Sequence, residues 1–164
     1  MKSKTLYIAY GSNLNLTQMA CRCPTAKVVG TSELKDYELL FRGSRHSAVA
    51  TVEPYKGGRV PVLLWTLKEK DLQALDRYEG YPHFYRKEIF PVELKGKTVP
   101  AMAYIMNDGH PFGAPSDHYL NTILEGYESA GFDTEVLEQA VEKSIRLAEE
   151  QQPEQENLFG LKWW

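Results

Sequence analysis

Cysteine is scarce in this sequence: Cys21 and Cys23 are the only two among 164 residues, and a single residue separates them. Two cysteines so close together cannot provide the set of disulfides that holds a small secreted fold together. The four histidines are scattered, at positions 46, 83, 110 and 118, without the spacing of a zinc site. The sequence therefore predicts neither a disulfide framework nor a bound metal.

Long hydrophobic runs are also missing. The apolar stretch at residues 6–10 stops at Gly11, Ser12 and Asn13, so it is too short for the core of a signal peptide and much too short to cross a bilayer. We therefore expect a cytoplasmic protein that does not contact a membrane.

Neither sign of charge dominates, because 19 Lys and Arg face 22 Asp and Glu and leave a net charge of −3. A nucleic-acid-binding domain usually carries a strongly basic surface, so we expect no nucleic-acid partner. The 43% of hydrophobic and 25% of charged residues are ordinary for a globular protein.

The length predicts one domain, which we place at residues 1–150. We expect the polar tail at 151–164, which ends in Trp163 and Trp164, to be either docked or disordered.

Strands are expected to predominate up to residue 106. A buried first strand at 6–10 ends in a tight turn, and further strands are expected at 26–34, 37–41, 48–52, 60–67, 84–94 and 99–106. Glycines predict hairpin turns at 56–59 and 95–97. Many short strands in succession favour a closed or nearly closed β-barrel, because closure removes exposed sheet edges.

Helices are expected before, between and after these strands. Asn15 or Thr17 can cap a short helix that ends before Pro24. A second helix is expected at 68–79, a third from a Ser116 cap to residue 130, and a last one that begins at Asp133 or Thr134. Together with the strands they predict an α+β fold, a small mixed barrel with its C-terminal helices packed on it.

The turn Tyr10-Gly11-Ser12-Asn13 lies between a predicted strand and a predicted helix. Unpaired backbone N–H groups and the helix dipole can make such a turn a pocket for negative charge. The Lys-Ser/Thr pair of a nucleotide P-loop is missing. A Gly-Ser-Asn turn after a strand is common, so an ordinary tight turn is the alternative, and both interpretations stay open here.

Glu79 is expected at the C-terminal end of the helix at 68–79, on the same face as Leu72 and Leu75. Burial of that face against the sheet, among aromatic side chains, would raise the pKa of the carboxyl group, and the helix dipole acts in the same direction. Such a carboxyl group is suited to proton transfer near neutral pH. The alternative is that Glu79 pairs with Arg77 or Arg86, or turns to solvent.

Three further side chains are candidates for substrate contact. Tyr119 lies one position off the apolar stripe of its predicted helix, so it either points into a cavity or packs in the core. Arg45 and His46 lie in a predicted loop, where they either contact a substrate carboxylate or stay in solvent.

Several segments, in this order, resemble the γ-glutamylcyclotransferase-like family, which includes plant avirulence-induced and bacterial members. They are Leu-Tyr-Ile-Ala-Tyr-Gly-Ser-Asn-Leu at 6–14, the strand at 60–67 that leads into Leu75-Asp76-Arg77-Tyr78-Glu79-Gly80, and Ser116-Asp117-His118-Tyr119-Leu120. The likeness extends from Thr5 to the last helix.

The resemblance implies a barrel that holds a γ-glutamyl group at its mouth and releases 5-oxoproline without a metal or organic cofactor. By position, it implies that Glu79 is the acid/base residue and that Tyr119 faces the substrate. It also implies that the substrate is bound by Tyr10, Gly11, Ser12, Asn13 and Leu14. It transfers no role to Arg45 or His46, and it leaves the amine attached to the γ-glutamyl group open.

Three hypotheses follow. The first is an enzyme that cyclises the γ-glutamyl group of a small molecule. The second is a binding module of the same fold that holds a small metabolite without converting it. The third concerns the tail, whose tryptophans would serve self-association into a homodimer or contact with a partner.

Overall fold

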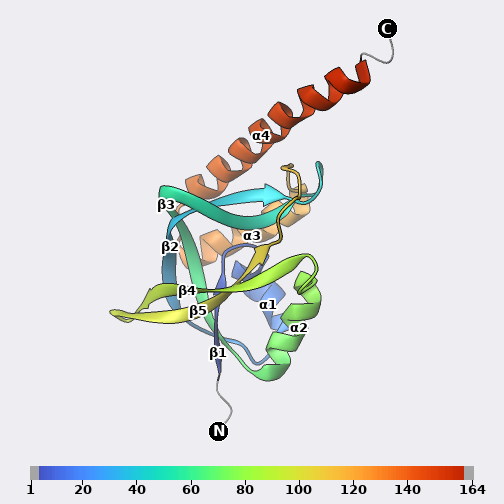
Figure 1. Ribbon diagram of the computed structural model, residues 1–164. Helices are drawn as coiled ribbons and strands as arrows, with labels where there is room; N and C mark the ends of the chain where they lie inside the picture. Colours follow the sequence, from blue (N-terminus) through green and yellow to red (C-terminus); the bar gives the residue numbers. More distant parts are fainter. Residues whose placement is uncertain (1–3, 161–164) are drawn as a thin grey trace.

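The computed structural model describes the backbone of residues 4–160 and the side chains up to residue 151 (Figure 1). It confirms the α+β class. The chain forms β1 (Thr5–Ala9), the 3₁₀ turn η1 (Ser12–Leu14), α1 (Leu16–Arg22), β2 (Lys27–Arg42), β3 (Val49–Leu67), α2 (Glu69–Glu79), β4 (Tyr85–Leu94), β5 (Lys97–Met106), α3 (Asp117–Ala130) and α4 (Thr134–Gly160).

The five strands form one sheet in the order β2-β3-β1-β5-β4. The central strand β1 pairs antiparallel with β3, with Thr5 opposite Leu67, and parallel with β5. Tyr7, Ile8 and Ala9 are all buried, as expected for a strand covered on both faces. The first strand of the sequence is therefore the middle of the sheet, and the turn that follows it starts from a fixed point.

The edge strands β2 and β4 are not joined into a closed barrel. Within residues 4–160 no ladder of backbone hydrogen bonds connects them. Side chains fill the seam instead, and the rings of Tyr37 on β2 and Phe90 on β4 meet edge to face at 5.2 Å between centroids. The sheet is strongly curved and nearly closed, with packing in place of the last ladder.

The prediction of a hairpin turn at 56–59 is wrong. These residues lie inside the long strand β3, and the loop that joins β2 to β3 is at 43–48. The register between the two strands jumps from Lys35–Arg59 to Tyr37–Pro54, so residues 55–58 bulge opposite a single residue, Asp36. The Asp36 carboxylate accepts the N–H of Gly57 at 2.9 Å, which satisfies part of the bulge. The short strands expected at 26–34 and 37–41 are thus one long strand, β2, and those expected at 48–52 and 60–67 are another, β3.

The second hairpin prediction is confirmed. Leu94 of β4 pairs with Lys97 of β5, and the two residues between them, Lys95 and Gly96, have φ values of 52° and 78°. Positive φ at both central residues is typical of the two-residue turns that join antiparallel strands.

The predicted helix caps are confirmed as well. The side chain of Asn15 accepts the N–H of Gln18 at 3.0 Å to start α1, and that of Ser116 accepts the N–H of Tyr119 at 3.2 Å to start α3. Gly80 ends α2 in the left-handed conformation, with a φ of 65°.

The last helix, α4, runs past residue 150 to Gly160 and projects away from the sheet in Figure 1. Trp163 and Trp164, for which a docked or disordered tail was expected, lie outside the described residues. Among residues 4–160, no helix combines the length and the apolar character needed to cross a membrane.

Strand and helix lengths bring the end of α2 to the first turn. β3 ends opposite Thr5, the start of β1, and α2 then runs in roughly the same direction as β1 (Figure 1). The 11 residues of α2 span about 16 Å and the five residues of β1 about 17 Å. The C-terminal end of α2 therefore reaches the level at which β1 gives way to Gly11.

The turn is held from behind by α3, where Gly126 touches it directly. A Cβ atom at Gly126 would lie 2.6 Å from the Cβ and 2.7 Å from the carbonyl carbon of Leu14. These distances are too short for any real contact, so only glycine lets α3 approach the turn this closely.

We predict that Gly126→Ala lowers the free energy of unfolding by about 1–3 kcal/mol, because the added methyl group must push α3 and the turn apart. Urea unfolding measures the change. Glu128→Ala, at an exposed position of the same helix, is the control and should change the free energy by less than about 0.5 kcal/mol. Equal values for the two variants would contradict the close packing.

Candidate active site

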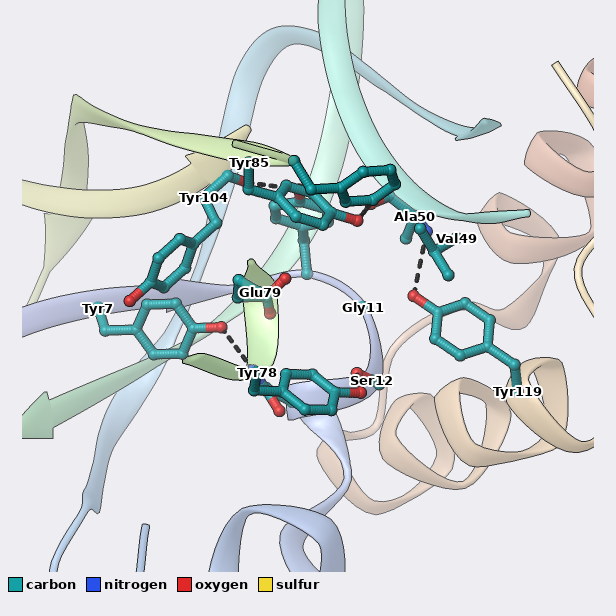
Figure 2. A pocket seen from close by; sticks show the side chains of 13 residues that line it. Tyr7, Gly11, Ser12, Val49, Ala50, Tyr78, Glu79, Tyr85, Tyr104 and Tyr119 are labelled. Carbon is teal, nitrogen blue, oxygen red and sulfur yellow. Dashed lines mark hydrogen bonds between the residues drawn. The ribbon is translucent and has the colours of Figure 1, made fainter. Parts of the chain in front are cut away.

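A cavity of about 230 Å³ opens between the first turn, the end of α2 and the strands β3, β4 and β5 (Figure 2). Of the seven residues expected at the site, six line this cavity: Tyr10, Gly11, Ser12, Asn13, Glu79 and Tyr119. The turn and the acid are thus walls of one pocket.

The expectation that Leu14 binds substrate is not supported by its position. The Leu14 side chain is fully buried, and Leu14 does not line the cavity. Its N–H donates to the carbonyl oxygen of Gly11 at 3.0 Å, and its backbone lies against Gly126. Leu14 belongs to the core that supports the turn. Arg45 and His46 also do not line the cavity, and their side chains are exposed in the loop at 43–48.

Hydrogen bonds to two helices, α2 and α3, fix the turn. The Ser12 hydroxyl lies 3.1 Å from the hydroxyl of Tyr78 on α2, and Asn15 donates to the Thr122 carbonyl of α3 at 3.0 Å. Because η1 begins here, the N–H groups of Ser12 and Asn13 have no partner in the preceding turn. No described residue accepts a hydrogen bond from these two groups. They are the unpaired donors that the sequence predicted.

Glu79 is half-buried in the middle of the pocket (Figure 2). Within the described residues its carboxyl group forms no hydrogen bond or salt bridge. The expected alternative partner Arg86 binds Glu88 instead, at 2.7 Å. Burial raises the pKa of Glu79 to about 7, and the positive charge of Arg22 opposes the rise only in part. The carboxyl group is therefore poised to take up and release a proton near neutral pH.

Tyrosines surround Glu79, yet three of them donate their hydroxyl protons elsewhere. Tyr10 donates to the carbonyl oxygen of Tyr104 at 2.6 Å, and Tyr85 donates to that of Ala50 at 2.7 Å. Tyr104 donates to the Asp76 carboxylate at 2.6 Å. A hydroxyl that donated to Glu79 would favour the ionised form and lower its pKa. Because these hydroxyl protons are donated to other groups, burial removes water from Glu79 and these three tyrosines provide no hydrogen bond in its place.

Asp76 fixes the end of α2 to the sheet. Besides the Tyr104 hydroxyl of β5, its carboxylate binds the ammonium group of Lys87 on β4 at 2.9 Å. Asp76 precedes Glu79 by three residues, and therefore lies on nearly the same face of α2. This link holds the helix end, and Glu79 with it, at a fixed position over the cavity.

The opposite wall is the backbone of Ala50, on β3. Its N–H donates to the Tyr119 hydroxyl at 3.0 Å, as drawn in Figure 2, and its carbonyl accepts from Tyr85. Tyr119 lines the pocket and does not only pack in the core, which decides between the two alternatives for its position. Gly11 lies close to this wall, since a Cβ there would be 3.1 Å from the Cβ of Ala50.

Sequence reasoning missed several residues of the site: Tyr7, Ala50, Tyr104 and the nearby Arg22. The residues next to Tyr7 in β1 and next to Tyr104 in β5 are also apolar, so nothing local distinguishes the two tyrosines. The signal that could have found them is the pairing of β1 with β5, which places Tyr7 opposite Met102.

Among the described residues, neither a cluster of metal-ligating side chains nor a cysteine lines the pocket. No three His, Cys, Asp or Glu side chains of the described part of the chain come together as a metal site would require. Both cysteines are free, Cys21 exposed and Cys23 buried, and burial raises the pKa of the Cys23 thiol to about 11.

Comparison with protein families gives one match that spans most of this chain. The family model described as "Gamma-glutamyl cyclotransferase, AIG2-like" matches residues 7–126. This range includes the turn, α2 and the strands around the cavity, together with most of α3.

Individual proteins agree with this match. A human protein named gamma-glutamylcyclotransferase is 28% identical over 142 residues, which cover 81% of this chain and 75% of the human protein. A solved structure titled "Gamma-glutamyl cyclotransferase" is 27% identical with a TM-score of 0.76, covering 84% of this chain and 86% of the other. The crystal structure of YkqA from Bacillus subtilis shares the fold, with a TM-score of 0.73 at 23% identity, over 88% of this chain and 55% of that protein.

We predict that Glu79→Gln stabilises the protein at alkaline pH and not at acid pH. The pKa of Glu79 rises from 4.5 to about 7 on folding, so its contribution to stability is lost as the pH rises from 4.5 to 7. A glutamine cannot ionise, so the variant does not lose this stability. The difference in free energy of unfolding between the variant and the natural protein should therefore be up to about 3 kcal/mol larger above pH 7 than at pH 4. Urea unfolding at pH 4 and pH 8 measures the difference. A gain that is the same at both pH values would contradict the raised pKa.

Proposed function

Because the chain belongs to the gamma-glutamyl cyclotransferase, AIG2-like family, we propose that it is a γ-glutamylcyclotransferase. Its substrate is a small molecule in which a γ-glutamyl group is joined to an amine or amino acid through an amide bond. The products are 5-oxoproline and the released amine. The observation that carries the proposal is an unpaired, half-buried Glu79 with a pKa of about 7, in one cavity with the unpaired N–H groups of Ser12 and Asn13.

The reaction needs one bond to form and one to break. The α-nitrogen of the γ-glutamyl group attacks its own γ-carbonyl carbon and closes a five-membered lactam. The original amide bond then breaks, and its nitrogen departs as an amine. Over the whole reaction, protons leave the α-nitrogen and are gained by the departing nitrogen.

Glu79 is the carrier of that proton transfer in our proposal. A free α-amine titrates near pH 8, close enough to the pKa of about 7 of Glu79 for the carboxylate to accept its proton. The protonated Glu79 then acts as the acid that donates to the departing nitrogen. A single residue serves both steps because both nitrogens are bonded to the same carbon in the intermediate.

The main task of the protein is to hold the γ-glutamyl group folded back, with its α-nitrogen close to its γ-carbonyl carbon. The reacting nitrogen and carbonyl belong to the same molecule, and well-oriented intramolecular reactions reach effective molarities of about 10⁵ M or more. A protein nucleophile is therefore unnecessary. The closed walls of tyrosine rings and the close approach of Gly11 to Ala50 favour a compact, folded-back γ-glutamyl group over an extended one.

In our proposal the turn stabilises the negative charge that develops on the γ-carbonyl oxygen. The N–H groups of Ser12 and Asn13 need an acceptor, and we assign them to this oxygen. A donor of this kind is worth about 3 kcal/mol in other acyl-transfer sites. Tyr119 accepts the Ala50 N–H and keeps its own proton, which we assign to the α-carboxylate of the substrate.

The first test is product formation. Purified protein is incubated with a panel of γ-glutamyl amino acids and γ-glutamyl amines, and 5-oxoproline is measured. We predict turnover of at least one compound by the natural protein and loss of turnover by about 10²-fold or more in Glu79→Gln, with binding retained, because the amide cannot carry a proton.

Glu69→Gln is the matched control, since Glu69 is exposed in the first turn of the same helix. It should leave turnover unchanged. Retained turnover in Glu79→Gln would exclude the proton-transfer role. If the folded natural protein binds a γ-glutamyl compound and never converts it, the binding-module hypothesis replaces the enzyme.

The pH dependence of kcat/KM gives an independent prediction. Glu79 must be ionised to accept a proton, so kcat/KM should increase between about pH 5 and pH 7 and level off only at higher pH. The measurement uses the best substrate of the panel at concentrations well below KM. A rate that is constant between about pH 5 and pH 8 would show that no group with the pKa of Glu79 controls catalysis.

A further inference from the structure

Three side chains form a hydrogen-bonded chain that leads from solvent into the cavity. The guanidinium group of Arg22, on α1, donates to the side-chain oxygen of Asn13 at 2.8 Å. The side-chain nitrogen of Asn13 donates to the hydroxyl oxygen of Tyr7 at 2.9 Å. Asn13 and Tyr7 are 3% and 4% exposed, so the inner part of this chain is shielded from water.

The direction of these hydrogen bonds is fixed by chemistry. An arginine side chain has only donors, so the atom of Asn13 that faces Arg22 must be the amide oxygen. The amide nitrogen then faces Tyr7, and nitrogen in an amide can only donate. The Tyr7 oxygen therefore accepts, and its single proton must point to some other group.

That proton has no acceptor among residues 4–160. Tyr10, Tyr85 and Tyr104, which also line the pocket, donate their protons to protein oxygens. Tyr7 differs from them, because its hydroxyl accepts a hydrogen bond from the protein and gives none back. Figure 2 shows the Tyr7 hydroxyl beside Glu79, and burial, followed by the nearby charge of Glu79, raises the pKa of Tyr7.

The positive charge of Arg22, at the solvent end of this hydrogen-bonded chain, makes the Tyr7 hydroxyl a better donor. Successive hydrogen bonds polarise one another, and more strongly in a poorly hydrated interior than in water. The positive Arg22 draws electron density along Asn13 and away from the Tyr7 oxygen. Its guanidinium group also lies 3.7 Å from the centre of the Tyr78 ring, which keeps it in place.

We propose that Tyr7 is a further catalytic residue, whose hydroxyl donates to the γ-carbonyl oxygen of the substrate, and that Asn13 and Arg22 are positioning residues that aim and polarise it. This inference rests on the proposed function. Glu79 must touch the two nitrogens bonded to the γ-carbonyl carbon, so a donor beside Glu79 lies beside the oxygen of that carbonyl. Tyr119 has a similarly available proton, but it lies against Ala50 on another wall.

The first experiment compares Tyr7→Phe with the natural protein, using the best γ-glutamyl substrate at a pH well above 7, where Glu79 is ionised. A donor that acts on developing charge affects kcat, so we expect kcat to fall by about 10²-fold and KM to change by less than about three-fold. Tyr127→Phe is the control, because that buried hydroxyl has no partner among the described residues and lies outside the cavity. It should leave kcat unchanged, and thermal unfolding checks that both variants fold.

The second experiment tests whether Arg22 acts through Tyr7. Arg22→Met alone should lower kcat by about ten-fold, the worth of one charge-assisted hydrogen bond. Combined with Tyr7→Phe it should cause no further loss, because the group that it polarises is gone. Arg77→Met, at an exposed position of α2, should leave kcat unchanged. A merely structural role of Arg22 would instead give losses that multiply.

The outcomes separate this inference from the proposed function. If the natural protein forms 5-oxoproline and Tyr7→Phe keeps its kcat, or loses only substrate affinity, the role of Tyr7 is overturned and the enzyme stands. If the two variants multiply in their effects, the role of Arg22 is overturned. If the natural protein converts no γ-glutamyl compound at all, the proposed function is wrong and the inference is overturned with it.

Discussion

The site depends on one constraint: the Glu79 carboxyl group is kept from water while three of the tyrosine hydroxyl groups around it donate to other protein oxygens. Tyr10, Tyr85 and Tyr104 could each stabilise an ionised Glu79, yet all three hydrogen-bond to protein oxygens. The pKa therefore stays near 7. The same arrangement costs folding stability at neutral pH, as is common where a group is held ready for chemistry.

The topology explains how such a site arises from distant segments. β1 is the central strand, so the turn after it starts from the most rigid part of the sheet. α2 returns along β1 over a similar length and delivers Glu79 beside that turn. Asp76, through Tyr104 and Lys87, fixes the helix end, while α3 supports the turn from behind at Gly126. The two walls of the pocket are thus held in place by contacts within the fold.

Local patterns in the sequence predicted the fold class, the helix caps at Asn15 and Ser116, and six residues of the pocket. The caps and the turn have a signal within a few residues, Glu79 and Tyr119 were placed from their positions on predicted helices, and the fold class follows from the succession of predicted strands and helices. The bulge opposite Asp36 and the open seam between β2 and β4 depend on strand register, which no local pattern contains. Tyr7 and Arg22 were missed for the same reason, since hydrogen bonds across elements reveal them.

In our proposal Glu79 is the proton carrier because its carboxyl group is poorly hydrated and has no hydrogen-bond partner among the described residues. The most direct measurement is an NMR titration of the Glu79 side-chain carboxyl carbon in the ligand-free protein, assigned by comparison with Glu79→Gln. The account predicts a midpoint of about 7. A midpoint near the ordinary value of 4.5 would mean that the carboxyl group is solvated or hydrogen-bonded in solution, and it would contradict the proposed proton transfer.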